Sequence, residues 1–225
     1  MALILNIDTS TESAAICLSK DGQQLASSES NEQKEHASWL HVAIDEMMKS
    51  NDFLMKDLNA VAVIDGPGSY TGLRVGMSAA KGLCYALQIP MITESSLKFM
   101  AYAAAKQLNN INDSILCPMI DARRMEVFSA LFNQALEELM MPSAMILDEK
   151  SFSPYFSSEK IYFFGNGATK WKKMTDSNNA FFADISFDIG YLGNLSYQKF
   201  VQQQFTDIIY SQPAYIKDFH SYIKK

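Results

Sequence analysis

A run of five apolar residues, Ala60-Val61-Ala62-Val63-Ile64, ends abruptly at Asp65-Gly66-Pro67-Gly68. The run has the length of a strand, and its unbroken apolar character is typical of a strand that is buried on both faces. Such strands belong to sheets that carry helices on both sides. The run therefore predicts an α/β fold in which helices cover a central sheet.

The segments before and after this strand are predicted to alternate between strands and helices, as in an α/β fold. Three short strands are expected at 3–9, 12–19 and 22–28, with helices over about 36–50, 72–87 and 95–107 and a further strand at 89–93. After residues 109–113 a second, less periodic unit begins with strands at 115–120 and 126–132. It continues with a strand at 160–164 and helices over 168–174 and 191–205. The chain is therefore predicted to hold two α/β subdomains, 1–108 and 109–225.

Composition narrows the class of protein. The 225 residues carry a formal net charge of −6, which excludes a free-standing basic nucleic-acid binder. No apolar run approaches the roughly 20 residues that span a bilayer, and the first residues lack the basic region of a secretory signal. We therefore expect a cytoplasmic protein without membrane contact. The three cysteines, Cys17, Cys84 and Cys117, lie among apolar residues, which predicts reduced thiols in the core.

Motifs of several enzyme classes are missing from the sequence. The histidines are His36, His41 and His220, and the spacing of the first two turns their rings about 140° apart on a helix. These two cannot hold one metal ion from that helix, and no HExxH zinc motif occurs. The segment 66–72 reads GPGSYTG, which matches neither the dinucleotide motif GxGxxG nor the phosphate loop GxxxxGK. Neither a metal site nor a catalytic residue is predicted.

The same glycine-rich segment can still present backbone N–H groups at the start of a helix, where the helix dipole favours an anion. Together with the acidic residue that ends the first strand, it supplies the candidate anion- or nucleotide-contacting residues Asp8, Gly68, Ser69 and Thr71. The alternative is structural, because Ser69 or Thr71 can cap the helix and glycines are common in tight turns.

The helix predicted over 72–87 carries apolar or small residues over more than half of its circumference. A helix that lies on one sheet needs an apolar arc of only about 100°, so the wider arc indicates a second packing partner. The helix predicted from His36 repeats the pattern. Two interpretations stay open, because either another subunit or a second element of the same chain can cover these faces. The residues predicted for a subunit interface are Ala37, Leu40, Ile44, Met47, Gly72, Leu73, Gly76, Met77, Ala79, Ala80 and Leu83.

Five segments together resemble the bacterial TsaB (YeaZ) family. They are Asp8-Thr9-Ser10-Thr11, residues 65–76, Asp121-Ala122-Arg123-Arg124-Met125-Glu126-Val127-Phe128, Gly165-Asn166-Gly167 and Pro213-Ala214-Tyr215-Ile216-Lys217. The resemblance covers nearly the whole chain. It implies an actin-like ATPase (ASKHA) fold of two related subdomains, of which the second is reduced.

The resemblance also implies a function. TsaB-like proteins are partner subunits of TsaD, which binds metal and nucleotide and transfers a threonylcarbamoyl group to the tRNA adenosine 3′ of the anticodon. TsaE, a P-loop ATPase, joins them. The implied role is a non-catalytic dimerisation subunit that pairs with a TsaD-like protein through helices of the first subdomain, or with a second copy of itself when TsaD is absent. It would meet tRNA only within the complex.

The resemblance has one informative departure. TsaD carries an HxxxH metal motif where this chain has His36-Ala37-Ser38-Trp39-Leu40-His41. No metal or cofactor of its own is therefore implied for this chain, although a nucleotide at the subunit junction is compatible with the family.

Two other functions compete with this one. An actin-like fold normally closes around a nucleotide, and in an ATP-dependent phosphotransferase Asp8 would orient a magnesium ion. Against this, Arg123 and Arg124 occupy the turn where a glycine turn is wanted, and structural roles are predicted instead: Asp8 caps a strand turn and Arg123 pairs with Glu126. A peptidase is disfavoured by the missing metal motif and by the absence of a GxSxG nucleophile motif.

Overall fold

The first half of the chain folds around one mixed sheet. The computed structural model describes residues 1–32, 36–109, 114–156 and 159–217, so His220 lies outside the described residues. Five strands form the sheet in the order β3-β2-β1-β4-β5, namely β1 (Leu3–Asp8), β2 (Ala14–Lys20), β3 (Gln23–Ser30), β4 (Ala60–Gly66) and β5 (Met91–Ser95). The central strand β1 pairs antiparallel with β2 and parallel with β4, which in turn pairs parallel with β5. The predicted strands are confirmed.

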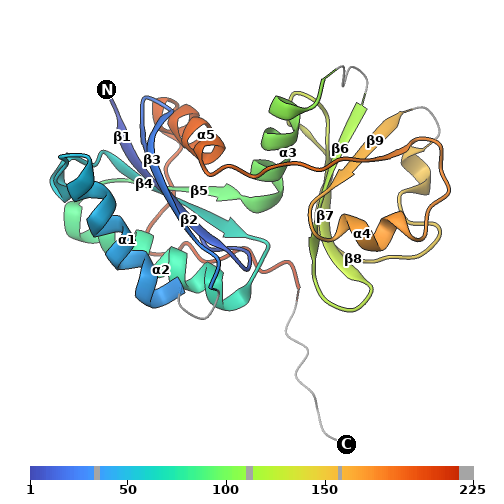
Figure 1. The fold of residues 1–225 in the computed structure, drawn as a ribbon, viewed down its shortest axis with the longest axis horizontal. Coiled ribbons are helices and arrows are strands. Elements are labelled where there is room, and N and C mark those ends of the chain that lie inside the picture. Colours follow the sequence, from blue (N-terminus) through green and yellow to red (C-terminus); the bar gives the residue numbers. More distant parts are fainter. Residues whose placement is uncertain (33–35, 110–113, 157–158, 218–225) are drawn as a thin grey trace, which may run out of the picture.

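Helices cover both faces of this sheet, as the buried run in β4 predicts. On one face lie α1 (His36–Ser50) and α2 (Tyr70–Leu87), and on the other lies α5 (Gly190–Val201) (Figure 1). The helix α3 (Ser96–Gln107) follows β5. The expected helices of this half are confirmed with ends shifted by at most two residues. Among the described helices, none is long and apolar enough to span a membrane.

The second half repeats the strand topology of the first. Its sheet has the order β10-β9-β6-β7-β8, with β6 (Ser114–Asp121), β7 (Glu126–Phe132), β8 (Glu138–Ile146), β9 (Lys160–Phe164) and β10 (Ala180–Phe182). The pairing pattern of the first sheet recurs, since β6 pairs antiparallel with β7 and parallel with β9, as β1 does with β2 and β4. The helices are shorter: the 3-10 helix η3 (Ser153–Tyr155) stands where the first half has α1, and α4 (Ala168–Lys172) where it has α2. The reduction predicted for this half is confirmed.

Two strands of this sheet, β8 and β10, were not predicted. Both lie at its edges, where one neighbour is missing and the side chains need not alternate strictly. In β8 no residue is fully buried, and Pro142 interrupts the sequence in a way that edge strands tolerate. In β10 only three residues are paired. Neither strand therefore carries the periodic signal that identifies a central strand.

The last helix of each half packs on the sheet of the other half. The helix α3, from the first half, lies against β6 and β7, whereas α5, from the second half, lies against β1, β2, β3 and β5. Figure 1 shows both helices between the two sheets, where they also contact each other. The sequence assigned 109–225 to the second subdomain, but α5 packs on the first sheet. Each subdomain is therefore completed by a helix from the other part of the chain.

The helix α2 approaches the end of β1 so closely that only glycine fits at two positions. The hydroxyl of Thr9 donates a 2.7 Å hydrogen bond to the carbonyl of Gly72. A Cβ atom added at Gly72 would lie 2.0 Å from the Thr9 carbonyl oxygen, and one added at Gly76 would lie 2.4 Å from Thr9 Oγ1. The small residues of α2 thus serve packing within the chain.

The three cysteines are free and buried, as expected. Burial raises the pKa of Cys17 to about 12, with a contribution from Asp188. Burial likewise raises the pKa of Cys117 to about 12 and that of Cys84 to about 11. Because the thiolate is the reactive form, these thiols stay protonated and serve as apolar packing groups.

The close approach of α2 predicts a stability effect for Gly72→Ala. The added methyl group meets a backbone carbonyl that cannot rotate away, so we expect the free energy of unfolding to fall by about 1–3 kcal/mol in urea denaturation. Gly82→Ala in the same helix is the matched control, because its Cβ meets no atom within 4 Å and helix propensity should raise stability by about 0.5–1 kcal/mol. Equal denaturation midpoints for Gly72→Ala and the parent chain would contradict the packing.

Candidate functional site

Residues of α1 and α2 line a groove on the surface of the first subdomain. These two helices lie on the face of the first sheet opposite α5 (Figure 1). It has a volume of about 600 Å³. Its lining is mostly apolar or small and carries few charges. The lining residues are Ala37 and His41 from α1, and Tyr70, Thr71, Arg74, Val75, Ser78, Ala79, Gly82 and Leu83 from α2. A helix of another protein chain is the kind of ligand that such an elongated surface fits.

The structure corrects most of the residues predicted for a subunit interface. Eight of the eleven are buried within the chain and do not line the groove: Leu40, Ile44, Met47, Gly72, Leu73, Gly76, Met77 and Ala80. The remaining three, Ala37, Ala79 and Leu83, line the groove, although Ala79 is also largely buried. The wide apolar arc therefore has two parts, of which the larger one faces the sheet. The second interpretation of that arc, cover by the same chain, holds for these eight residues.

Sequence reasoning missed the polar half of the groove. His41, Tyr70, Arg74 and Ser78 lie on the sides of the helices that a helical wheel assigns to solvent. A signal for the groove was present in Gly82, a glycine inside a helix with nothing within 4 Å of its ideal Cβ. A glycine that no packing requires, among the small residues of an exposed helix face, indicates room for another backbone.

Three of the four candidate anion-contacting residues, Asp8, Gly68 and Ser69, are linked through Ser10 at the start of α2. The amide of Ser69 donates to the carbonyl of Ser10 at 2.6 Å, and Gly68 lies so close that a Cβ there would be 2.2 Å from the same oxygen. The amide of Ser10 in turn donates to Asp8 Oδ1 at 2.8 Å. Thr71 is exposed and lines the groove instead.

Two N–H groups of this helix start, those of Ser69 and Gly72, donate within the chain itself. Ser69 is the N-cap and accepts from the amide of Gly72 at 3.3 Å, while its carbonyl accepts from Leu73 at 2.8 Å. These bonds satisfy the capping role considered for Ser69. The anion site stays a prediction, and the internal bonds leave few donors for it.

Asp8 lies beside a buried histidine and a buried serine. Burial raises the pKa of Asp8, which the hydrogen bonds from Ser10 and the nearby charge of His36 oppose. The ring of His36 is buried, with Nε2 3.1 Å from the carbonyl oxygen of Glu12. Its Nδ1 has no hydrogen-bond partner in the described residues. The predicted capping role of Asp8 at the strand turn is confirmed by its bond to the Ser10 amide.

The C-terminal segment 206–217 returns along the first subdomain. It begins with Thr206, whose amide donates to the carbonyl of Met91 at 2.8 Å. Further on, the amide of Ala214 donates to the carbonyl of Asp65 at 2.7 Å, at the end of β4. The hydroxyl of Tyr215 accepts from Arg74 Nε at 2.9 Å. The segment therefore follows α2 from its C-terminal end towards its N-terminus.

Two carboxylates and one lysine lie partly buried beneath this segment. Lys199 Nζ is 3.0 Å from Glu94 Oε2 and donates to the carbonyl of Thr93 at 2.7 Å. Asp65 lies nearby, close to the end of β4. Its pKa is raised to about 6 by burial and by the charge of Glu94, which Lys199 only partly offsets. The group therefore carries an unfavourable excess of negative charge near neutral pH.

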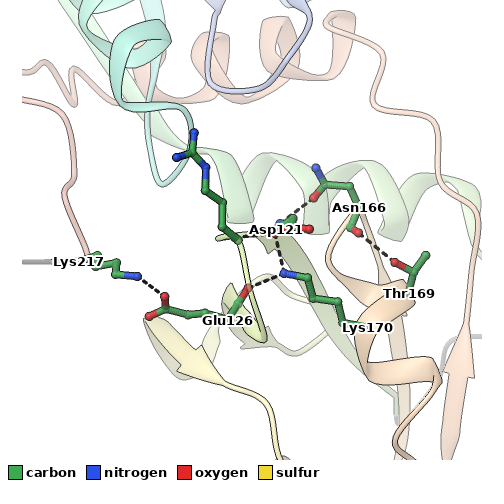
Figure 2. A network of polar contacts seen from close by, with 7 residues as sticks. Asp121, Glu126, Asn166, Thr169, Lys170 and Lys217 are labelled. Carbon is green, nitrogen blue, oxygen red and sulfur yellow. Dashed lines mark hydrogen bonds and ion pairs between the residues drawn. The ribbon is translucent and has the colours of Figure 1, made fainter.

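A polar network fixes the turn between β6 and β7 (Figure 2). Lys170 donates to Asp121 Oδ1 at 2.6 Å and to the carbonyl of Glu126 at 3.0 Å, and Asn166 accepts from the amide of Asp121 at 2.8 Å. The prediction that Arg123 pairs with Glu126 is wrong, because the Glu126 carboxylate pairs with Lys217 of the C-terminal segment. Lys217 thus ties that segment to the second subdomain.

The two arginines of the turn adopt left-handed backbone conformations, with φ of 71° at Arg123 and 50° at Arg124. The amide of Arg123 donates to Asp121 Oδ1 at 2.6 Å, which helps to hold the turn. In the part of the chain that the structure describes, no group of three or more His, Cys, Asp or Glu side chains could hold a metal ion.

Comparisons with known proteins agree on one family. The family model described as "TsaD: tRNA N6-adenosine threonylcarbamoyltransferase" matches residues 25–188. The tRNA threonylcarbamoyladenosine biosynthesis protein TsaB of Bacillus subtilis is 30% identical over 77% of this chain and 75% of its own length. The TsaB of Haemophilus influenzae is 27% identical over 96% of this chain and 93% of its own length.

A solved structure shares the whole fold. It is that of a Pseudomonas aeruginosa protein described as similar to the peptidase YEAZ, with a TM-score of 0.81 and 21% identity, and it covers 96% of this chain and 100% of its own. With the two sheets of equal topology, this likeness confirms the expected actin-like (ASKHA) fold of two subdomains. At this level of identity the likeness concerns the fold alone.

The raised pKa of Asp65 predicts a pH-dependent stability. Its ordinary pKa is 3.8 and its pKa in the folded chain is about 6. At pH values between these two, Asp65 is therefore protonated in the folded chain and ionised in the unfolded chain. The resulting destabilisation is absent below pH 3.8, grows as the pH rises and is complete above about pH 6. Asp65→Asn should therefore raise the free energy of unfolding at about pH 7.5 by up to about 3 kcal/mol.

Urea denaturation at about pH 5 and about pH 7.5 tests this expectation, because the gain from Asp65→Asn should shrink at the lower pH. The exposed Asp176 offers the matched control, since Asp176→Asn should change stability little at either pH. A gain that is the same at both pH values would show that the substitution acts through packing and not through the buried charge.

Proposed function

Since this chain belongs to the TsaB (YeaZ) family of tRNA threonylcarbamoyladenosine biosynthesis proteins, we propose that it is a non-catalytic partner subunit of a TsaD-like enzyme. In this role it binds and orients the enzyme that adds the threonylcarbamoyl group to tRNA. It acts in the cytoplasm, associates with a TsaE-like ATPase through the complex, and meets tRNA only there. A second copy of the chain takes the partner's place when the TsaD-like subunit is absent.

The groove between α1 and α2 is the observation that carries the proposal. It is open in the isolated chain, and its lining includes Ala79, Gly82 and Leu83. Small residues let a second helix approach near the short end of the usual distance of about 8–10 Å between helix axes. Burial of the apolar lining supplies the driving force for association.

The TsaD-like partner is proposed because this chain is itself similar to the TsaD family. The TsaD family model matches this chain over residues 25–188, a range that includes both α1 and α2. A TsaD-like protein therefore has related helices at related positions. Two related surfaces can pack as a pseudo-symmetric pair, which explains why a second copy of this chain is the substitute.

The state of the two histidines on α1 supports the non-catalytic role. His36 is buried, with its Nε2 against the carbonyl of Glu12, whereas His41 lines the groove. Their rings therefore lie in different environments and cannot close around one metal ion. TsaD relies on two histidines at a shorter spacing for its metal, as the family resemblance implies, so this chain lacks that ligand pair.

Blocking the groove is the direct test of the proposal. Ser78→Trp places a large side chain into the groove from an exposed position, so it should leave folding unchanged and weaken association with a co-expressed TsaD-like protein by at least about tenfold. Size-exclusion chromatography of the co-expressed pair and titration calorimetry measure the association.

Gln198→Trp is the matched control, because Gln198 is exposed on α5, at the opposite face of the sheet. This variant should bind like the parent chain. Undiminished pairing of Ser78→Trp, with a circular dichroism melting curve equal to that of the parent, would exclude the groove as the partner-binding surface. Equal loss of binding by both variants would point to a general effect of the added tryptophan.

A further inference from the structure

Arg74 gives the groove its one permanent charge. Among the residues that line the groove it is the one Lys or Arg, and its side chain is exposed. In the described part of the chain no ion pair joins Arg74 to a carboxylate. The groove therefore presents a positive charge within a mostly apolar surface.

Two tyrosines hold the guanidinium group of Arg74. Its Nε donates to Tyr215 Oη at 2.9 Å, and its Cζ lies 3.9 Å from the centre of the Tyr70 ring and 5.8 Å from that of Tyr215. The two rings are 5.2 Å apart. A guanidinium group has five N–H donors, and the two tyrosines account for only part of them. Arg74 is thus oriented while donors remain for a further acceptor.

Docking of a helix into the groove changes the solvation of the Arg74 guanidinium group. In the isolated chain, water solvates the guanidinium group. A docked helix removes part of that water, and a charge that loses its solvation is costly unless an opposite charge replaces the water. Arginine and tyrosine are also among the residue types that most often dominate the binding energy of protein interfaces, and here they contact each other.

We propose that Arg74, oriented by Tyr215, anchors a carboxylate on the helix that the TsaD-like partner places in the groove. The proposal rests on the function proposed above and adds the chemistry of the partner. Arg74 contacts the partner, and Tyr215 is a positioning residue. The preferred acceptor is an Asp or Glu side chain, because a carboxylate matches the planar fork of the guanidinium group.

The C-terminal segment is what brings Tyr215 to Arg74. Asp65 fixes the backbone one residue earlier, through the 2.7 Å bond from the amide of Ala214. Two residues later Lys217 pairs with Glu126 of the second subdomain. Tyr215 therefore lies between two attachment points, one on each subdomain. This segment, remote in sequence from α2, belongs to the partner-binding surface.

Binding measurements on four variants of the full chain test the proposal. Titration calorimetry with the TsaD-like protein at about 50 mM and about 300 mM salt should show that Arg74→Gln weakens binding about 10- to 100-fold at low salt and loses much of the salt dependence. The affinity of Arg74→Lys should lie between that of the parent chain and that of Arg74→Gln, because lysine keeps the positive charge but lacks the planar fork of the guanidinium group. Tyr215→Phe should weaken binding by about 3- to 10-fold. Lys49→Gln, on α1 outside the groove lining, is the charge-matched control and should bind like the parent.

The outcomes separate this inference from the proposed function. If Ser78→Trp abolishes binding while Arg74→Gln and Tyr215→Phe bind within about twofold of the parent, the carboxylate anchor is wrong and the groove remains the binding surface. If Arg74→Gln weakens binding with an unchanged salt dependence, the side chain contributes packing, and the anchor is again wrong. If Arg74→Gln weakens only self-association, the occupant is a second copy of the chain, and the assignment to the TsaD-like partner is overturned. Melting curves of all variants check folding, and Arg74→Lys provides the test should Tyr215→Phe prove unstable.

Discussion

The close approach of α2 to the end of β1 is the constraint on which the rest of the first subdomain depends. Thr9 donates to the carbonyl of Gly72, and no side chain larger than glycine fits at Gly72 or Gly76. This contact fixes the rotation of α2 about its axis. It thereby decides which residues face the sheet and which remain for another chain. The groove exists because the glycine face of the helix is turned inward and the face of Arg74, Ser78 and Gly82 is turned outward.

The two halves share one strand topology but differ in the length of their helices, and among the described residues the groove belongs to the half with the longer ones. Both sheets have the same strand order, yet α2 spans 18 residues whereas its counterpart α4 spans five. A helix of five residues can cover part of its sheet, and α4 does so by placing Trp171 in the core of the second half. It is too short to form an elongated groove with a neighbouring helix. The reduced half contributes in another way, since Glu126 holds Lys217 and with it the end of the C-terminal segment.

The sequence predicted elements better than it predicted faces. Periodicity and the glycine-rich turn located every strand and α-helix of the first half, because a strand buried on both faces and two long amphipathic helices give strong signals. The short 3-10 helix Met55–Asp57 was not predicted. A helical wheel gives the width of an apolar arc but not which part of it meets the sheet. Leu40, Gly76 and Met77 were therefore assigned to an interface although they are buried within the chain. The pairing of Arg74 with Tyr215 joins residues 141 positions apart and leaves no local pattern.

The exchange of α3 and α5 between the sheets has a consequence for synthesis on the ribosome. The apolar face formed by Ile4, Ala60, Ala62 and Ile92 packs against Tyr197 and Phe200 of α5. A nascent chain that has just released β5 therefore holds a sheet with one uncovered side, and about a hundred further residues must emerge before α5 can close it. Completion of the first subdomain is delayed until α5 has emerged, an interval in which chaperones have an exposed hydrophobic sheet to protect.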